Sequence, residues 1–304
     1  MSTILTEIKK YDKAQKDWDK IHPATSGTIT QVGKEIEVKG KAIGAYAVGD
    51  KIKLGDNIAD VIAHLVQQRI AATYTAPTEA IAVASGTAKG TYEVGTAVDA
   101  TIRATFTKHD AGDITSHKIN DGTSDVVTGT TNPAEYKYTA TLGEGTVTFT
   151  ATCAYGQGAL KKDNLLDDSP AGRIEAGSKT ASLSYTGIRK GFYGADSTSS
   201  DALATSADIR KLTASSGALK KDSTFTMTIP KGSKKCTIAF DKAIGTTISK
   251  VLYVEGSNTN VVGQFAFSTV AVDGANGFAS KDYTVATLAW AQPTAAAMTF
   301  NVTL

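Results

Sequence analysis

Histidine and carboxylate residues that could bind a metal or move a proton gather around His109. Asp110 and Asp113 follow directly, and His117 comes shortly after them. Imidazole and carboxylate groups together could ligate a transition metal or share a proton. However, the run from Asp110 to Asp113 has the composition of a hairpin loop, and His117 lies within the strand-like run Ile114–Ile119. The sequence therefore favours a turn and a strand histidine over a metal site.

A second group of oxygen-bearing side chains consists of Asp163, Asn164, Asp167 and Asp168. Carboxylate and amide oxygens are ligands for calcium, but their spacing here matches no EF-hand loop. Acids of a solvated, turn-forming loop are the favoured interpretation. The sequence therefore predicts no metal at this position either.

The sequence carries none of the common catalytic or cofactor-binding motifs. It has no G-x-S-x-G elbow, phosphate-binding loop, dinucleotide fingerprint or H-E-x-x-H pair. Cys153 and Cys236 are far apart, each within a strand-like run, which fits neither a disulfide framework nor zinc-ligand spacing. We interpret both as buried, small apolar side chains. The prediction is a protein that is not an enzyme, with no catalytic residue, no cofactor and no metal.

Composition and charge argue against two classes of partner. Lys and Arg number 32 and Asp and Glu 30, so the basic surface that binds nucleic acid is not expected. Hydrophobic residues make up 41% of the chain, and no run approaches the roughly 20 apolar residues of a spanning helix. The first twenty residues carry charges throughout and do not resemble a signal peptide. With only two cysteines, these features favour folding in a reducing cytoplasm.

We predict that residues 1–26, the first element of the chain, form a helical anchor. Its apolar stripe has the alternating three- and four-residue spacing of a heptad pattern. A helix this short needs a surface to pack on. A sister helix in an oligomer, a groove on another protein and the chain's own body are the three alternatives. The predicted oligomer or anchor residues are Ile4, Ile8, Tyr11, Gln15 and Trp18.

Residues 27–75 predict a short α/β stem. Short runs in which apolar and polar residues alternate, separated by glycines, indicate short strands. A helix is then expected, with Asp56 as its N-cap and His64 as a satisfied or solvated side chain rather than a ligand. The face expected for this helix contains Ile58, Val61, Ile62, Leu65 and Arg69.

The rest of the chain predicts two β-sandwiches in series, so the expected fold class is mainly β. Apolar residues alternate with polar ones from Val98 to Phe106 and from Val147 to Tyr155, with turns between short strands. This pattern predicts an immunoglobulin-like sandwich over residues 76–187. Similar alternation, ending with Met298 to Leu304, predicts a C-terminal sandwich over residues 188–304.

The order of several short motifs resembles that of fibre and appendage proteins from the virions of tailed, gut Bacteroides-type bacteriophages. The resemblance covers about residues 45–304. The motifs that carry it are Ala45–Ile52 with Leu54–Asp56, Tyr92–Thr96 with Asp110–Gly112, Phe192–Gly194 with Asp208–Leu212, and Thr228–Gly232 with Ile238–Phe240.

The resemblance implies a virion structural protein, made in the host bacterial cytoplasm, of the head-fibre or tail-fibre type. Such proteins are commonly homotrimers, anchored here through the N-terminus to capsid, portal, tail or other virion proteins, and they display β domains for host attachment. The alternative function is an adhesin that binds a host-surface glycan or protein. Its ligand-stacking candidates, for each of which a place in the core is the competing role, are Phe192, Tyr193, Tyr253 and Trp290.

Overall fold

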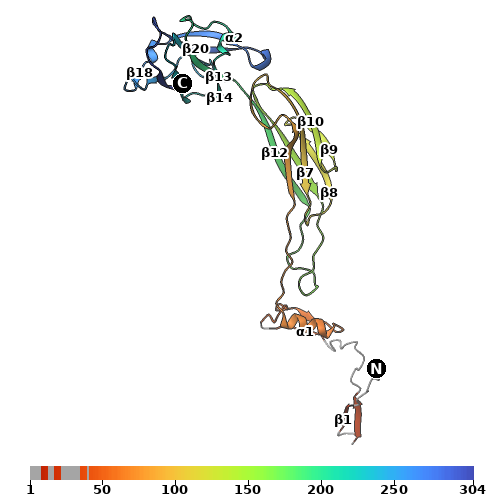
Figure 1. Cartoon of the computed structure of the whole chain (residues 1–304). Coiled ribbons are helices and arrows are strands. Elements are labelled where there is room, and N and C mark those ends of the chain that lie inside the picture. The colour runs from red at the N-terminus through yellow and green to blue at the C-terminus, as the bar shows by residue number, and fades with distance from the viewer. Residues whose placement is uncertain (1–7, 13–16, 22–34, 40) are drawn as a thin grey trace, which may run out of the picture. The chain divides into compact units, whose positions relative to one another are not determined.

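The computed structural model describes residues 8–12, 17–21, 35–39 and 41–304 (Figure 1). The chain is mainly β, with 48% of residues in strands and 7% in helices. It divides into two compact units. The α1 unit contains Met1–Pro77, Lys108–Asp113 and Gly156–Gly177, and the sandwich unit contains Thr78–Thr107, Ile114–Tyr155 and Ser178–Leu304.

The predicted N-terminal helix is wrong over the residues that the structure describes there. β1 (Ile8–Asp12) and β2 (Asp17–Ile21) form an antiparallel hairpin, with Tyr11 opposite Trp18 in the register. An apolar pattern over so few residues is compatible with either a helix or a strand, so the spacing does not decide between them. Ile4 and Gln15 lie outside the described residues.

The centre of the α1 unit is a small α/β element. β3 (Ile36–Glu37) pairs with β4 (Lys51–Ile52), and α1 (Ile58–Val66) follows. The N-cap of α1 is Asn57, whose Oδ1 accepts a hydrogen bond from Ala59 N at 2.8 Å, and not the predicted Asp56. Asp56 instead accepts from Lys53 N and so closes the preceding turn.

The extended segment after α1 is held by side chains of two returning segments of the same unit. Asn164 Oδ1 accepts from Ile70 N at 2.6 Å, and Ser169 Oγ accepts from Ala72 N at 2.8 Å. Asp110 Oδ2 accepts from Thr75 N at 2.7 Å. Side chains thus satisfy backbone groups that no β-ladder pairs.

The sandwich unit begins with two sheets packed around one core (Figure 1). The first sheet has the order β10-β7-β5 and the second β6-β12-β11-β8-β9, in which only the β6–β12 pairing is parallel among the pairings described. The predicted alternation in β7 is confirmed, because Val98, Ala100, Ile102, Ala104 and Phe106 are all buried. The strands are β5 (Thr78–Gly86), β6 (Gly90–Glu93), β7 (Ala97–Thr107), β8 (Ile114–Asn120), β9 (Asp125–Gly129), β10 (Ala134–Thr141), β11 (Gly145–Tyr155) and β12 (Gly177–Ile188).

The C-terminal half also has two sheets, with the orders β14-β13-β16-β20-β19 and β15-β21-β17-β18. The five-stranded sheet is covered on both faces: one faces the other sheet, and the other packs with Ile209 of α2 (Ser206–Ile209). Burial on both faces explains why β16 and β20 read as continuous buried runs. The strands are β13 (Lys190–Asp196), β14 (Thr213–Ala218), β15 (Thr224–Ile229), β16 (Lys235–Asp241), β17 (Lys250–Tyr253), β18 (Thr259–Asn260), β19 (Ala266–Val272), β20 (Lys281–Ala289) and β21 (Met298–Thr303).

Candidate functional site

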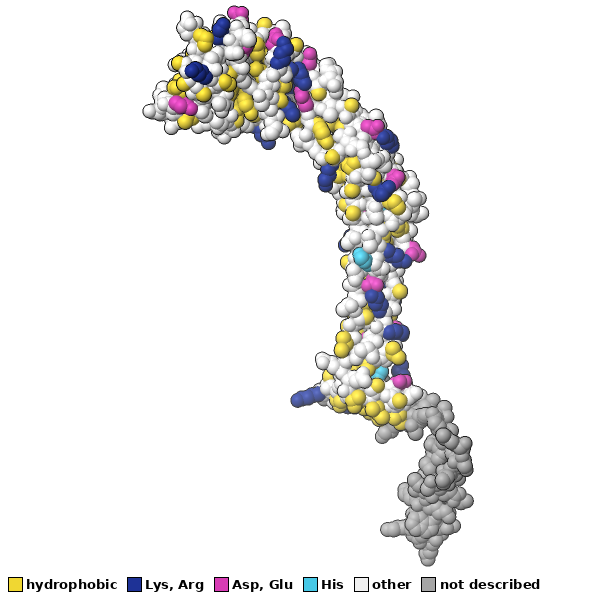
Figure 2. All heavy atoms as spheres, viewed as in Figure 1, with side chains coloured by type: hydrophobic (Ala, Val, Ile, Leu, Met, Phe, Trp, Pro, Cys, Tyr) yellow, Lys and Arg dark blue, Asp and Glu magenta, His cyan; other side chains and the backbone are white. Residues whose placement is uncertain are grey.

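Exposed apolar side chains concentrate in the α1 unit. Among the described residues, nine of the ten large hydrophobic side chains that remain exposed belong to this unit, and Phe267 is the tenth. Figure 2 shows hydrophobic side chains gathered around α1. We call the nine residues the exposed apolar set; they are Ile36, Ile43, Val48, Leu54, Ile62, Leu65, Val66, Ile70 and Leu166.

Three members of this set form a continuous face on α1. Ile62, Leu65 and Val66 have the i, i+3, i+4 spacing that places side chains next to one another on a helix, and Val66 is 73% exposed. Val61 and His64, on a neighbouring face, are buried. The helix therefore has more apolar surface than its own chain covers, and the sequence alone could not show which apolar residues would stay exposed.

Asp163 departs from the solvated, turn-forming loop that the sequence predicted at residues 163–168, whereas Asp167 of that loop is partly exposed and Asp168 is exposed. The Asp163 side chain is fully buried, and its Oδ2 lies 2.9 Å from Arg69 Nε. Asp163 Oδ1 accepts from Leu165 N at 2.8 Å and Asp167 N at 3.1 Å. Asp163 thus serves as a counter-ion for Arg69, which follows α1, and as the acceptor that closes the loop.

Asp167 joins this loop to the helix through two cationic partners. Its Oδ2 lies 2.5 Å from Arg69 Nη2 and also bonds His64 Nε2, while His64 Nδ1 donates to the Asp60 carbonyl at 2.6 Å. A hollow of about 500 Å³ lies beside the pair. Its polar lining includes Tyr46, Asp50, Lys53, Asp56, Asp60, His64, Arg69 and Asp167.

We expect the His64–Asp167 contact to make the stability of α1 depend on pH. Burial alone lowers the pKa of His64, but the bonds to Asp167 and the Asp60 carbonyl raise it above its usual value. The hydrogen bond from His64 lowers the pKa of Asp167. The contribution of His64 to the free energy of unfolding is complete below about pH 6.5 and is lost as the pH rises through the pKa of His64 in the folded chain. The contribution of Asp167 to the free energy of unfolding is complete above about pH 3.9 and is lost as the pH falls through the pKa of Asp167 in the folded chain.

The contact is therefore most stabilising between about pH 4 and 6.5. Hydrogen exchange of the α1 amides, corrected for intrinsic rates, should show greater protection at pH 5.5 than at pH 8. The variant His64→Gln should flatten this difference. An unchanged difference in the variant would show that another group causes it.

The structure separates the four predicted stacking residues rather than grouping them at one site. Phe192 is 2% exposed and packs with Tyr283 and Arg210, so its predicted role as a surface stacking residue is wrong. Tyr253 and Trp290 are partly buried against the core of the C-terminal sandwich. Tyr193 packs on Phe225 with ring centroids 4.7 Å apart and also lines a shallow, serine-rich hollow.

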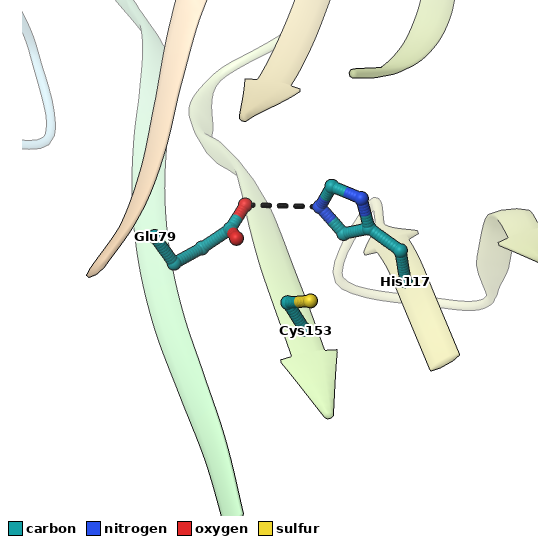
Figure 3. A group of neighbouring side chains, drawn as sticks. All are labelled: Glu79, His117 and Cys153. Carbon is teal, nitrogen blue, oxygen red and sulfur yellow. Dashed lines mark hydrogen bonds and ion pairs between the residues drawn. The ribbon is translucent and has the colours of Figure 1, made fainter. Parts of the chain in front are cut away.

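A buried cluster within the first sandwich brings together three chemically active side chains that no sequence motif connects. Glu79 of β5, His117 of β8 and Cys153 of β11 converge, as Figure 3 shows. Their potential ligand atoms all lie within 4.8 Å of one another. The signal lay in strand parity, because Glu79 alternates in step with Ile81 and Val83 and so faces inward.

Each member of this cluster is shielded from solvent. The Glu79 and His117 side chains are 0% exposed, and Cys153 is fully buried. Glu79 Oε1 lies 3.0 Å from His117 Nε2, and His117 Nδ1 lies 3.0 Å from the Thr131 carbonyl oxygen. Burial raises the pKa of Cys153 to about 11, and burial also raises the pKa of Glu79. The thiol is thus protonated at neutral pH and is not an activated nucleophile.

Among the described residues, no helix is long and apolar enough to cross a bilayer. The hairpin places Ile8, Tyr11 and Trp18 of the predicted anchor in strands, without a helical stripe.

Comparisons of the chain with models of protein families, with curated proteins and with solved structures found no match.

Proposed function

We propose that this chain is a structural protein of a tailed-phage virion, a head-fibre or tail-appendage component that assembles with copies of itself. The exposed apolar set of the α1 unit is the observation that supports self-assembly. Large apolar patches on a soluble protein mark surfaces that another molecule covers. The motif order over residues 45–304 supports the virion assignment.

Further copies of the same chain are the occupants that best suit this surface. Among its described residues, the α1 unit buries only four hydrophobic side chains, Val38, Ile52, Val61 and Ala111. A core this small gives little stability without additional burial. The net charge of +2 on 304 residues adds little repulsion between copies. Association would give the unit the apolar burial that it lacks alone.

The remaining details of the proposal come from the resemblance. We propose a homotrimer, attached through its N-terminal residues to capsid, portal or tail proteins, in which the two sandwiches are displayed outward. The sandwich formed by β5–β12 would be the immunoglobulin-like domain. Detection of the chain in purified particles, and its position in a particle density map, would test this assignment and decide between head and tail.

Light scattering coupled to size exclusion tests self-assembly directly. We expect the intact chain to be an oligomer at micromolar concentration and Val66→Glu to be a monomer, because a carboxylate at an apolar contact loses its hydration without a partner. The matched control is Phe267→Glu, which changes an exposed apolar residue of the sandwich unit and should leave the oligomer intact. A monomeric wild-type chain would refute self-assembly.

Tyr193 favours the adhesin alternative, because its hollow also contains Ser215, Ser216, Ser223 and Thr224. Stacking on an aromatic ring beside hydroxyl groups is a common way to hold a sugar. A glycan array probed with the intact chain and with Tyr193→Ala separates the two functions. Binding that disappears in the variant would favour the adhesin, whereas the fibre proposal expects equal signals from both proteins.

A further inference from the structure

The cluster of Glu79, His117 and Cys153 contains a buried polar atom that nothing nearby satisfies. Glu79 Oε2 has no hydrogen-bond partner among the described residues, although its side chain is 0% exposed. Leaving a buried acceptor unpaired costs about 1–3 kcal/mol, and more if it is charged. Such an atom needs an explanation, and an ion that it binds is one of the recognised explanations.

The imidazole of His117 is oriented as metal-binding histidines usually are. Its Nδ1–H donates to the Thr131 carbonyl oxygen at 3.0 Å, which leaves Nε2 to face Glu79. A backbone carbonyl at one ring nitrogen fixes the tautomer and makes the other nitrogen a better ligand. This outer contact therefore prepares Nε2 to donate its electron pair.

The thiol of Cys153 adds a soft ligand on the neighbouring strand. The register of β8 and β11 pairs Cys153 directly with His117, and Glu79 comes from the opposite sheet. Among the described residues, the one hydrogen-bond partner of the Cys153 thiol is the Ala154 carbonyl oxygen, 3.8 Å from Sγ. Sulfur is therefore free to bind an ion, and the three ligands would join both sheets of the sandwich.

We propose that Glu79, His117 and Cys153 form a binding site for Zn²⁺ that cross-links the two sheets. Zinc accepts nitrogen, sulfur and carboxylate oxygen in tetrahedral geometry, with bonds of about 2.0–2.3 Å. Those bonds place ligand atoms roughly 3.3–3.8 Å apart. The present separations of up to 4.8 Å need a shift of about 1 Å, within reach of rotamer adjustment in a metal-loaded chain. Calcium and magnesium are excluded because they prefer oxygen ligands alone.

A water molecule is the fourth ligand that this set requires. Binding releases the Cys153 thiol proton to solvent, so the Glu79 carboxylate and the Cys153 thiolate together balance the two charges of Zn²⁺. The bound metal has a structural role, because it fixes strand β5 against β8 and β11. This inference is independent of the proposed virion function, since it concerns only the core of one sandwich. Each can be refuted without affecting the other.

Titration of the intact, chelator-treated chain with Zn²⁺ alone tests the site. We expect one Zn²⁺ per chain and a rise in the melting temperature of the wild-type protein, because a ligand bound only by the folded state stabilises it. Loading during refolding, as well as after it, overcomes slow entry into the closed site. Failure to bind stoichiometric Zn²⁺ by either route would overturn the proposal.

Co²⁺ provides a spectroscopic check on the ligands. The wild-type chain should show a thiolate-to-Co²⁺ charge-transfer absorption. Cys153→Ala should lack this band, whereas Cys236→Ala, which removes the other buried cysteine, should retain it. A band that persists in Cys153→Ala would show that the metal binds elsewhere.

Glu79→Gln provides a second variant in case Cys153→Ala does not fold. It preserves the side-chain shape while removing the carboxylate charge, so the sandwich should form. We expect its Zn²⁺ affinity to fall by at least about tenfold, with the Co²⁺–thiolate band still detectable at saturation. Unchanged affinity would exclude Glu79 as a ligand and overturn the three-residue site.

Discussion

Replacing Arg69 by alanine is expected to lower the free energy of unfolding of the α1 unit by about 3 kcal/mol. The buried Asp163 carboxylate lies 2.9 Å from Arg69 Nε in an ion pair that is not aligned as a hydrogen bond. Without the guanidinium, Asp163 keeps two backbone donors but loses its counter-ion in a site without solvent. Removing one partner of a buried pair costs more than the pair itself contributes.

Hydrogen exchange of the amides of residues 163–169, together with denaturant unfolding, measures this loss. Lys162→Ala is the matched control, because Lys162 pairs with Asp168 at 2.7 Å in the same loop but both side chains are largely exposed. That surface pair should contribute no more than about 1 kcal/mol. Equal effects of the two substitutions would mean that burial of Asp163 does not control the stability of the loop.

Phe149→Ala is expected to destabilise the first sandwich by about 3–5 kcal/mol. Phe149 is 0% exposed on β11, with its ring centroid 4.8 Å from Tyr138 in an edge-on contact. Tyr136 and Tyr185 also pack against it. Alanine would leave a cavity at the centre of the core and remove several aromatic contacts at once.

Denaturant midpoints followed by near-ultraviolet circular dichroism would report the loss of this tyrosine cluster. Phe267→Ala is the control, since Phe267 of β19 is 37% exposed and should cost less than about 1 kcal/mol. A small effect of Phe149→Ala would indicate that the tyrosines collapse into the vacated space. The near-ultraviolet circular dichroism of the variant would change if the tyrosines moved into the vacated space and would stay the same if they kept their places.

Strand alternation was the most reliable guide to the fold. The inward face of β7 follows the Val98–Phe106 pattern, because period-two burial depends only on which sheet face meets the core. The N-terminal stripe misled, because apolar spacing over so few residues is compatible with either a helix or a hairpin. Asn57 and not Asp56 is the N-cap because the helix begins one residue later than predicted, and sequence patterns do not fix a helix boundary to a single residue.

The candidate sites were less predictable because they join distant segments. Glu79 and Cys153 could each be assigned to an inward position from strand parity, but their meeting depends on the order of strands in two sheets. Arg69 was predicted on the helix face, but α1 ends at Val66, and the partners of Arg69, Asp163 and Asp167, come from a loop far along the chain. Phe192 looked suitable for a ligand because aromatic type alone does not reveal burial.

The α1 unit is built from three separate stretches of chain, and this has a consequence for the order of events on the ribosome. A nascent chain that has reached Pro77 contains α1 but not yet the Asp163 that neutralises Arg69. Strands β5–β11 must be synthesised before that partner emerges. Since translation runs from the N-terminus, each copy makes most of its first sandwich before α1 is fixed in place. In the proposed self-assembly, contact between copies through α1 would therefore follow the synthesis of most of the first sandwich.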